Sequence, residues 1–255
     1  MLNDSLATES PRPVPRYQLA VLALLAIWAV LMTGAITAVM IISGKPYERA
    51  VLYMAVLLFV VWVMIGGTLQ YVYRHRVRAL VARSPFRWQT TFVLFCTVLA
   101  LLEEAVTTTL TNCAPLFGVA VGEAYITASA NYLDVVLFHS VVVFVPMFIA
   151  WAWILSRYEV RPVAVLLLFG CTGVLAEAGS FGLQNLLNAG FWVYVYGLMV
   201  ALPAFCVPRD RVTRKPRWWQ YLLFVVLPFI AVIPVAGIIH LIHPVSIHFP
   251  PIGGE

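Results

Sequence analysis

The chain has 255 residues, of which 62% are hydrophobic and 11% are charged, and its mean hydropathy is +0.93. A typical soluble domain has about 25% charged and about 45–50% apolar residues. This composition excludes a water-soluble globule, a disordered chain and a nucleic-acid-binding domain, despite a net charge of +5 at pH 7. The apolar runs are continuous rather than alternating with polar residues, which also excludes an outer-membrane barrel.

Long apolar stretches define the predicted elements. A membrane-spanning helix needs about 20 mostly apolar residues, and in lipid its backbone groups must be satisfied internally. Seven stretches meet this condition, at residues 17–43, 50–73, 89–112, 132–156, 162–186, 189–207 and 219–243. The predicted fold class is all-α, a polytopic integral membrane bundle of seven transmembrane helices. We expect residues 1–255 to form a single membrane domain.

Basic residues predict the orientation of the bundle. Most Lys and Arg residues lie before the first stretch or between the second and third, the fourth and fifth, and the sixth and seventh. Only Lys45 and Arg49 lie in a loop of the opposite set. By the positive-inside rule, the N-terminus is cytoplasmic and the tail from about Pro244 is outside. We expect a multi-pass protein of the cell membrane, taken as a bacterial or archaeal inner membrane, with the lipid bilayer as its partner and no nucleic acid.

The loop at residues 113–131 is too long for a minimal turn and too apolar for a solvated loop. It predicts a short interfacial or re-entrant helix that caps the outer side of the bundle. A lipid-like substrate would enter beside it.

Ionisable residues inside the stretches are costly in lipid, and each is therefore a functional candidate. Glu103 and Glu104 lie in the third stretch and Glu177 in the fifth, each about 22 Å along its helix from the cytoplasmic side. His139, in the fourth stretch beyond Asp134, lies about 10 Å below the outer surface. These depths nearly coincide, which predicts a site in the outer leaflet. His240 and His243 arrive near the outer rim, whereas His248 in the tail is expected to be inert.

These residue types favour a metal site. Carboxylates and imidazoles are ligands of zinc, iron and manganese, so the expected cofactor is a divalent metal. The candidate ligands are Glu104, His139, Glu177, His240 and His243. Glu103, Glu104 and Glu177 are the candidate catalytic residues, one of them a general base that activates water on the metal. The leading hypothesis is a metal-assisted enzyme acting on a lipid-soluble or membrane-adjacent substrate.

Two other functions fit the same residues. Buried carboxylates beside a histidine are typical of a proton- or cation-coupled transporter. The same polar groups also serve to hold helices together in a non-catalytic membrane subunit or assembly factor, with a membrane protein as partner.

The Glu103–Glu104 pair followed by His139 in the next stretch is similar to the pattern of intramembrane CAAX-type prenyl endopeptidases. That family continues with an arginine four residues after the second glutamate, where this chain has Thr108. It also has a later histidine–asparagine motif, and the fifth and sixth stretches contain no histidine. The resemblance covers one pair and one residue, so it implies no fold or activity for this chain.

Overall fold

The computed structural model describes residues 15–252, and the regular elements of this part are helical. The first half contains α1 (Arg16–Ser43), α2 (Pro46–Leu58), the π-helical η1 (Phe59–Gly66), α3 (Gly67–Val81) and α4 (Trp88–Asn112). The second half contains α5 (Tyr132–Asp134), the π-helical η3 (Val135–His139), α6 (Val141–Arg157), α7 (Pro162–Phe181), η4 (Leu183–Asn188), α8 (Ala189–Cys206) and α9 (Trp218–Ile242). The all-α prediction is confirmed.

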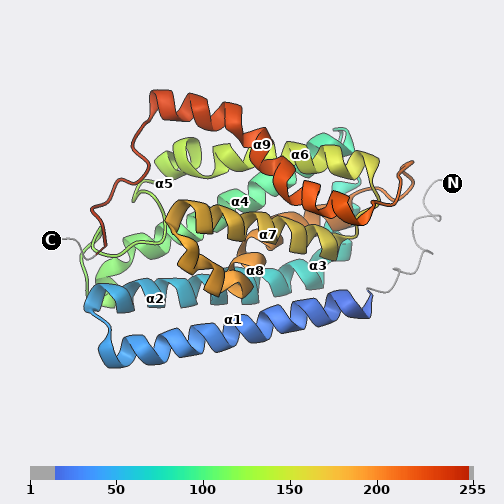
Figure 1. The fold of residues 1–255 in the computed structure, drawn as a ribbon. Helices are drawn as coiled ribbons and strands as arrows, with labels where there is room; N and C mark the ends of the chain where they lie inside the picture. Colours follow the sequence, from blue (N-terminus) through green and yellow to red (C-terminus); the bar gives the residue numbers. More distant parts are fainter. Residues whose placement is uncertain (1–14, 253–255) are drawn as a thin grey trace.

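The helices have the length and composition of membrane spans. Six qualify directly, over Arg16–Ile42, Pro46–Val81, Trp88–Asn112, Pro162–Ser180, Leu183–Cys206 and Trp218–Ile242. The fourth predicted span is a pair, Tyr132–His139 and Val141–Arg157, bent by 45° at Ser140. The described chain therefore has six helices that are long and apolar enough to span a membrane, or up to seven when the bent pair counts as one span. Figure 1 shows their arrangement.

Close packing of α7 against α8 forms the centre of the bundle. A Cβ atom at Gly170 would lie 2.6 Å from the carbonyl oxygen of Val193, and one at Gly197 would lie 2.8 Å from that of Leu166. Only glycine permits this approach of the two backbones. On another side, the indole nitrogen of Trp62 donates to the carbonyl of Val195 at 2.9 Å, which fixes η1 to α8.

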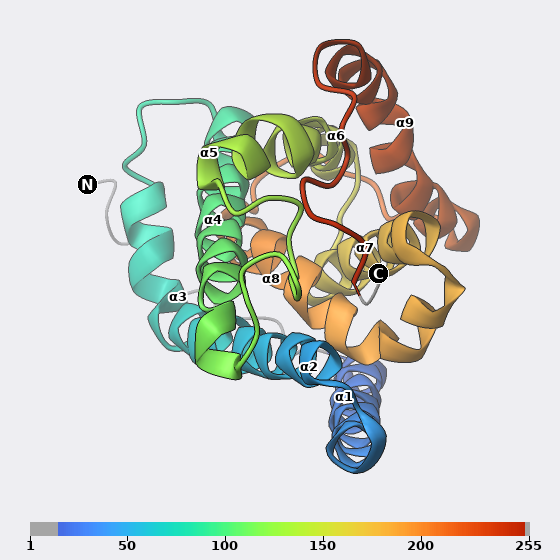
Figure 2. The ribbon, with the colours of Figure 1, turned by 90° about the vertical axis from the view of Figure 1, so that its left-hand side faces the viewer.

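Two helices lie at the margin of the bundle. Viewed from the end of the molecule, α1 and α9 project on opposite sides of the central helices (Figure 2). The first half of α9 is anchored by the buried residues Gln220, Phe224 and Pro228, whereas the second half exposes Ile233 and Leu241. Exposed apolar side chains on a membrane-type helix are the surface that contacts lipid.

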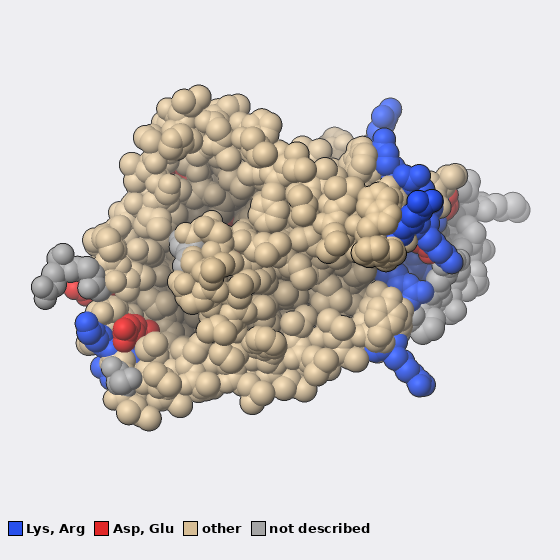
Figure 3. All heavy atoms as spheres, in the orientation of Figure 1, with Lys and Arg blue, Asp and Glu red and all other residues tan. Residues whose placement is uncertain are grey.

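Most of the Lys and Arg side chains visible in Figure 3 gather at one end of the molecule, and a smaller group lies at the other end beside acidic side chains. The opposite end carries the α1–α2 turn, the loop between α4 and α5, and the segment that follows α9 (Figure 1). We refer to it as the distal end. By the charge rule the distal end is the predicted outer side.

The loop between α4 and α5 differs from the expected helix. It has only one short 3₁₀ turn, η2, over Ala114–Phe117 and then continues as irregular chain. Gly118 (φ 83°) and Gly122 (φ 98°) adopt left-handed conformations, which stop a right-handed helix. Instead the loop packs as a small second core, in which Ala114, Val119 and Ala124 are buried with Ala50 and Met54.

Candidate metal centre

The bent span places Asp134 and His139 side by side. Five residues correspond to about 140° around an α-helix, which would point the two side chains apart. The segment is instead π-helical, and Ser140 N donates to the carbonyl of Val135, five residues back, at 3.0 Å. A π-turn brings residues five apart onto the same side. His139 Nε2 therefore lies 3.4 Å from Asp134 Oδ2.

The chain after α9 brings two further histidines to the same point. His243 is the C-cap of α9, and its ring stacks on Phe138 with 4.5 Å between centroids. The next residues cross the distal end, where His248 N donates to the carbonyl of Ala128 at 2.8 Å. Phe249 stacks on Tyr125 at 4.7 Å. Figure 2 shows this segment lying over the bundle beside the α4–α5 loop.

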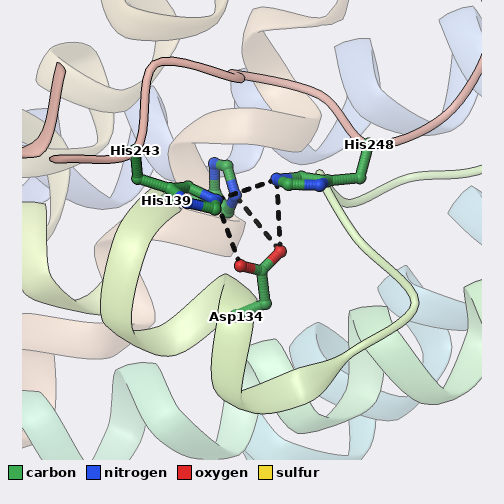
Figure 4. Close-up of side chains that lie close together, drawn as sticks. All are labelled: Asp134, His139, His243 and His248. Atoms are coloured by element: carbon green, nitrogen blue, oxygen red, sulfur yellow. Dashed lines mark hydrogen bonds and ion pairs between the residues drawn. The ribbon is translucent and has the colours of Figure 1, made fainter. Parts of the chain in front are cut away.

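The four side chains converge on one point (Figure 4). His243 Nε2 lies 3.2 Å from Asp134 Oδ1, His248 Nε2 lies 3.4 Å from Asp134 Oδ2, and the two Nε2 atoms are 3.0 Å apart. One ligand atom from each of the four residues lies within 4.8 Å of all the others. In a tetrahedral zinc site with bonds of ~2.0–2.1 Å, neighbouring ligand atoms are ~3.3–3.4 Å apart. The four separations of 3.0–3.4 Å are close to this spacing, and the remaining ones are no longer than 4.8 Å.

Hydrogen bonding alone does not account for this convergence. Asp134 Oδ2 and His139 Nε2 are fully buried and lie at an ion-pair distance of 3.4 Å from each other, but neither atom has a partner in hydrogen-bond geometry within the part of the chain that the structure describes. Buried polar atoms without a hydrogen bond are rare and are explained by a water molecule, an ion or a catalytic role. Three imidazoles and one carboxylate form a donor set suited to zinc and to neighbouring transition metals.

The centre is accessible from the distal end. The side chains of His243 and His248 are 25% and 29% exposed, whereas those of His139 and Asp134 are 10% and 15% exposed. Burial raises the pKa of the hydroxyl of Tyr125, whose ring stacks on Phe249 next to His248, above its ordinary value. The site thus has a buried inner side, at Asp134 and His139, and a more solvent-exposed outer side, at His243 and His248.

The structure brings together some of the predicted residues. His139 and His243 belong to the centre, whereas His240 is exposed and lies outside it. Glu104 and Glu177 are also outside this group. Asp134 was not a predicted ligand, and His248, expected to be inert, is one of the four. For Asp134, the available signal was a carboxylate in an apolar stretch five residues from a histidine.

The three glutamates form a separate group, the acidic cluster, deeper in the bundle. Glu103, Glu104 and Glu177 are 5%, 7% and 9% exposed and act electrostatically on one another. Thr107 Oγ1 donates to Glu104 Oε2 at 3.1 Å, and the Tyr196 hydroxyl donates to Glu177 Oε1. The Ser140 hydroxyl also faces the Glu104 carboxyl group. Since Ser140 follows His139, the two groups adjoin at the bend.

Comparisons of the chain with protein-family models, with curated proteins and with solved structures find no match.

Proposed function

We propose that the protein is a zinc-dependent membrane enzyme of the hydrolytic type. One observation carries this proposal: three imidazole nitrogens and a carboxylate oxygen converge, with one ligand atom from each residue within 4.8 Å of all the others. Two of the four atoms are buried without a hydrogen bond among the described residues. The partial exposure of His243 and His248 favours a catalytic site over a closed structural one, because catalytic zinc sites keep a position open to water.

The roles follow from the chemistry of zinc. Catalytic zinc sites have three protein ligands and keep the fourth position for water. His139, His243 and His248 would hold the ion, and Asp134, whose two oxygens both face the histidines, would bond the water. A bound zinc ion would supply a Lewis acid that makes a water molecule acidic near neutral pH. Asp134 would accept the proton of the water that attacks the substrate and would return it to the leaving group as the scissile bond breaks. Asp134 thus takes the role predicted for a glutamate.

Metal analysis of the detergent-purified protein tests the proposal. After dialysis with zinc we expect about one ion per chain, and His139→Ala and His243→Ala should each lower this to near zero because two ligands remain too few for a stable site. His240→Ala is the matched control, since His240 lies in the last turn of α9 but outside the centre. The proposal fails if the unaltered protein holds less than about 0.1 zinc per chain, or if His240→Ala loses as much metal as His243→Ala.

A further inference from the structure

The candidate metal centre joins two parts of the chain that are attached to the bundle in different ways. Asp134 and His139 lie on the bent span, which continues into α6, and the buried side chains of α6 hold this span in the core. His243 and His248 lie instead at and beyond the end of α9 (Figure 4). We call residues 243–252 the C-terminal strap. One half of the centre is therefore fixed by the core, whereas the other half depends on how firmly the C-terminal strap is held.

Few contacts outside the centre hold the C-terminal strap on the bundle. Among the described residues, a single backbone hydrogen bond joins the strap to the α4–α5 loop, from His248 N to the carbonyl of Ala128 at 2.8 Å. Two ring stacks add to it, Phe249 on Tyr125 and His243 on Phe138. Most other residues of the strap are exposed. A few contacts of this kind do not offset the conformational entropy that is lost when the strap takes one fixed path.

The second half of α9, which carries the strap, is also weakly attached. The first half is fixed to α7, because Thr172 Oγ1 donates to the carbonyl of Val225 at 3.1 Å. Pro228 and Pro234 follow inside the helix, and each lacks the N–H group of a helical hydrogen bond. Beyond them Ile238 is 59% exposed, so this half packs little against the bundle. The end of α9 and the strap can therefore move together while the first half of the helix stays in place.

We infer that the metal ion cross-links the C-terminal strap to the bent span, so that metal binding closes the strap over the distal end. The inference rests on the proposed function, because the ion is the proposed zinc, and it adds a regulation of that site. Ligands that come from separate segments couple metal binding to the ordering of those segments. In the metal-free protein the strap separates from Asp134 and His139, which then face water at the distal end. Metal loading, rather than substrate, thus controls this part of the fold.

Hydrogen–deuterium exchange tests the inference on the detergent-purified full chain, measured by mass spectrometry with zinc or with a chelator. We expect zinc to slow the exchange of the strap amides about tenfold, because the ion keeps His248 N bonded to the carbonyl of Ala128. Exchange in α7 is the internal control and should not change, because α7 packs at the centre of the bundle and carries none of the four ligands. Equal exchange of the strap in both samples would overturn the inference.

Variants on both halves of the centre test the cross-link itself. His139→Ala leaves the sequence of the strap unaltered but removes a ligand from the bent span, so the effect of zinc on the strap should disappear. His248→Ala should act alike, whereas His248→Cys should restore the effect because a thiolate also binds zinc. His240→Ala is the control and should respond to zinc as the unaltered protein does. Protection by zinc that survives in His139→Ala, or that is lost in His240→Ala, would overturn the inference.

Two measurements on the same preparations separate this inference from the proposed function. If about one zinc is bound per chain but exchange of the strap is unchanged, the inference fails and the metal enzyme stands. If the metal slows exchange but the absorption spectrum of the cobalt-loaded protein does not respond to azide, no coordination position is open. In that case the proposed enzyme fails and the cross-link stands as a structural metal site. If no metal binds, both fail.

Discussion

At the residue scale, the proposed centre depends most on Asp134. Each of the three imidazoles approaches one of its carboxylate oxygens at 3.2–3.4 Å. Loss of this negative charge would leave three imidazoles facing a divalent ion without compensation. Asp134 is thus the residue whose charge, rather than size, should control metal binding.

We therefore predict that Asp134→Asn lowers zinc affinity about 10–100-fold, the usual effect of losing an orienting carboxylate. Competition with a fluorescent chelator measures this change. Glu123→Gln is the matched control, because Glu123 is an exposed acidic residue of the neighbouring loop and lies outside the centre. Unchanged affinity in Asp134→Asn would show that the carboxylate has no part in binding.

Single residues also show what sequence reasoning could and could not predict about the site. His139 and the three glutamates stood out because ionisable groups are rare in apolar stretches. The contact between Asp134 and His139 could not be predicted, because a period of 3.6 residues places the two side chains on different faces of a helix. No pattern in the apolar sequence predicts a π-turn at this position. His248 was missed because only the path of the chain across the distal end brings it to His243.

At the element scale, the helices were predictable and their ends were not. Lipid forces apolar runs to be helical, so every predicted span has a counterpart. The second span extends from Pro46 to Val81, past the predicted 50–73, because α3 continues beyond its apolar part. The fifth ends at Phe181 rather than 186, because Gly182 has φ 99° and breaks the helix. A hydropathy profile does not report backbone conformation, so it could not predict where this helix ends.

The contact between α7 and α8 gives a prediction at this scale. A Cβ atom at Gly197 would lie 2.7 Å from Leu166 Cγ, so Gly197→Ala must separate the two helices. We expect a loss of about 1–3 kcal/mol, seen as a lower Tm in detergent. Gly237→Ala in α9 is the control, since a Cβ atom there meets nothing within 4 Å and alanine favours the helix. If both variants melt alike, the close approach of α7 and α8 is wrong.

At the scale of the whole molecule, the candidate metal centre and most of the basic side chains lie at opposite ends. Most of the visible basic side chains gather at one end (Figure 3). The candidate metal centre lies at the distal end, where His248 N donates to Ala128 O in the α4–α5 loop. The bent span connects this centre to the acidic cluster inside the bundle. The orientation in the membrane therefore decides from which side metal and water reach the centre.

The positive-inside rule predicts that they arrive from outside. Val212, between α8 and α9, is 99% exposed at the basic end, and Val245, after α9, is 51% exposed at the distal end. In a background carrying Cys113→Ser and Cys171→Ser, a membrane-impermeant maleimide should label Val245→Cys on intact cells. Val212→Cys should react only after permeabilisation, because its arginine-rich segment stays on the cytoplasmic side. The reverse pattern would place the metal centre in the cytoplasm and contradict the predicted orientation.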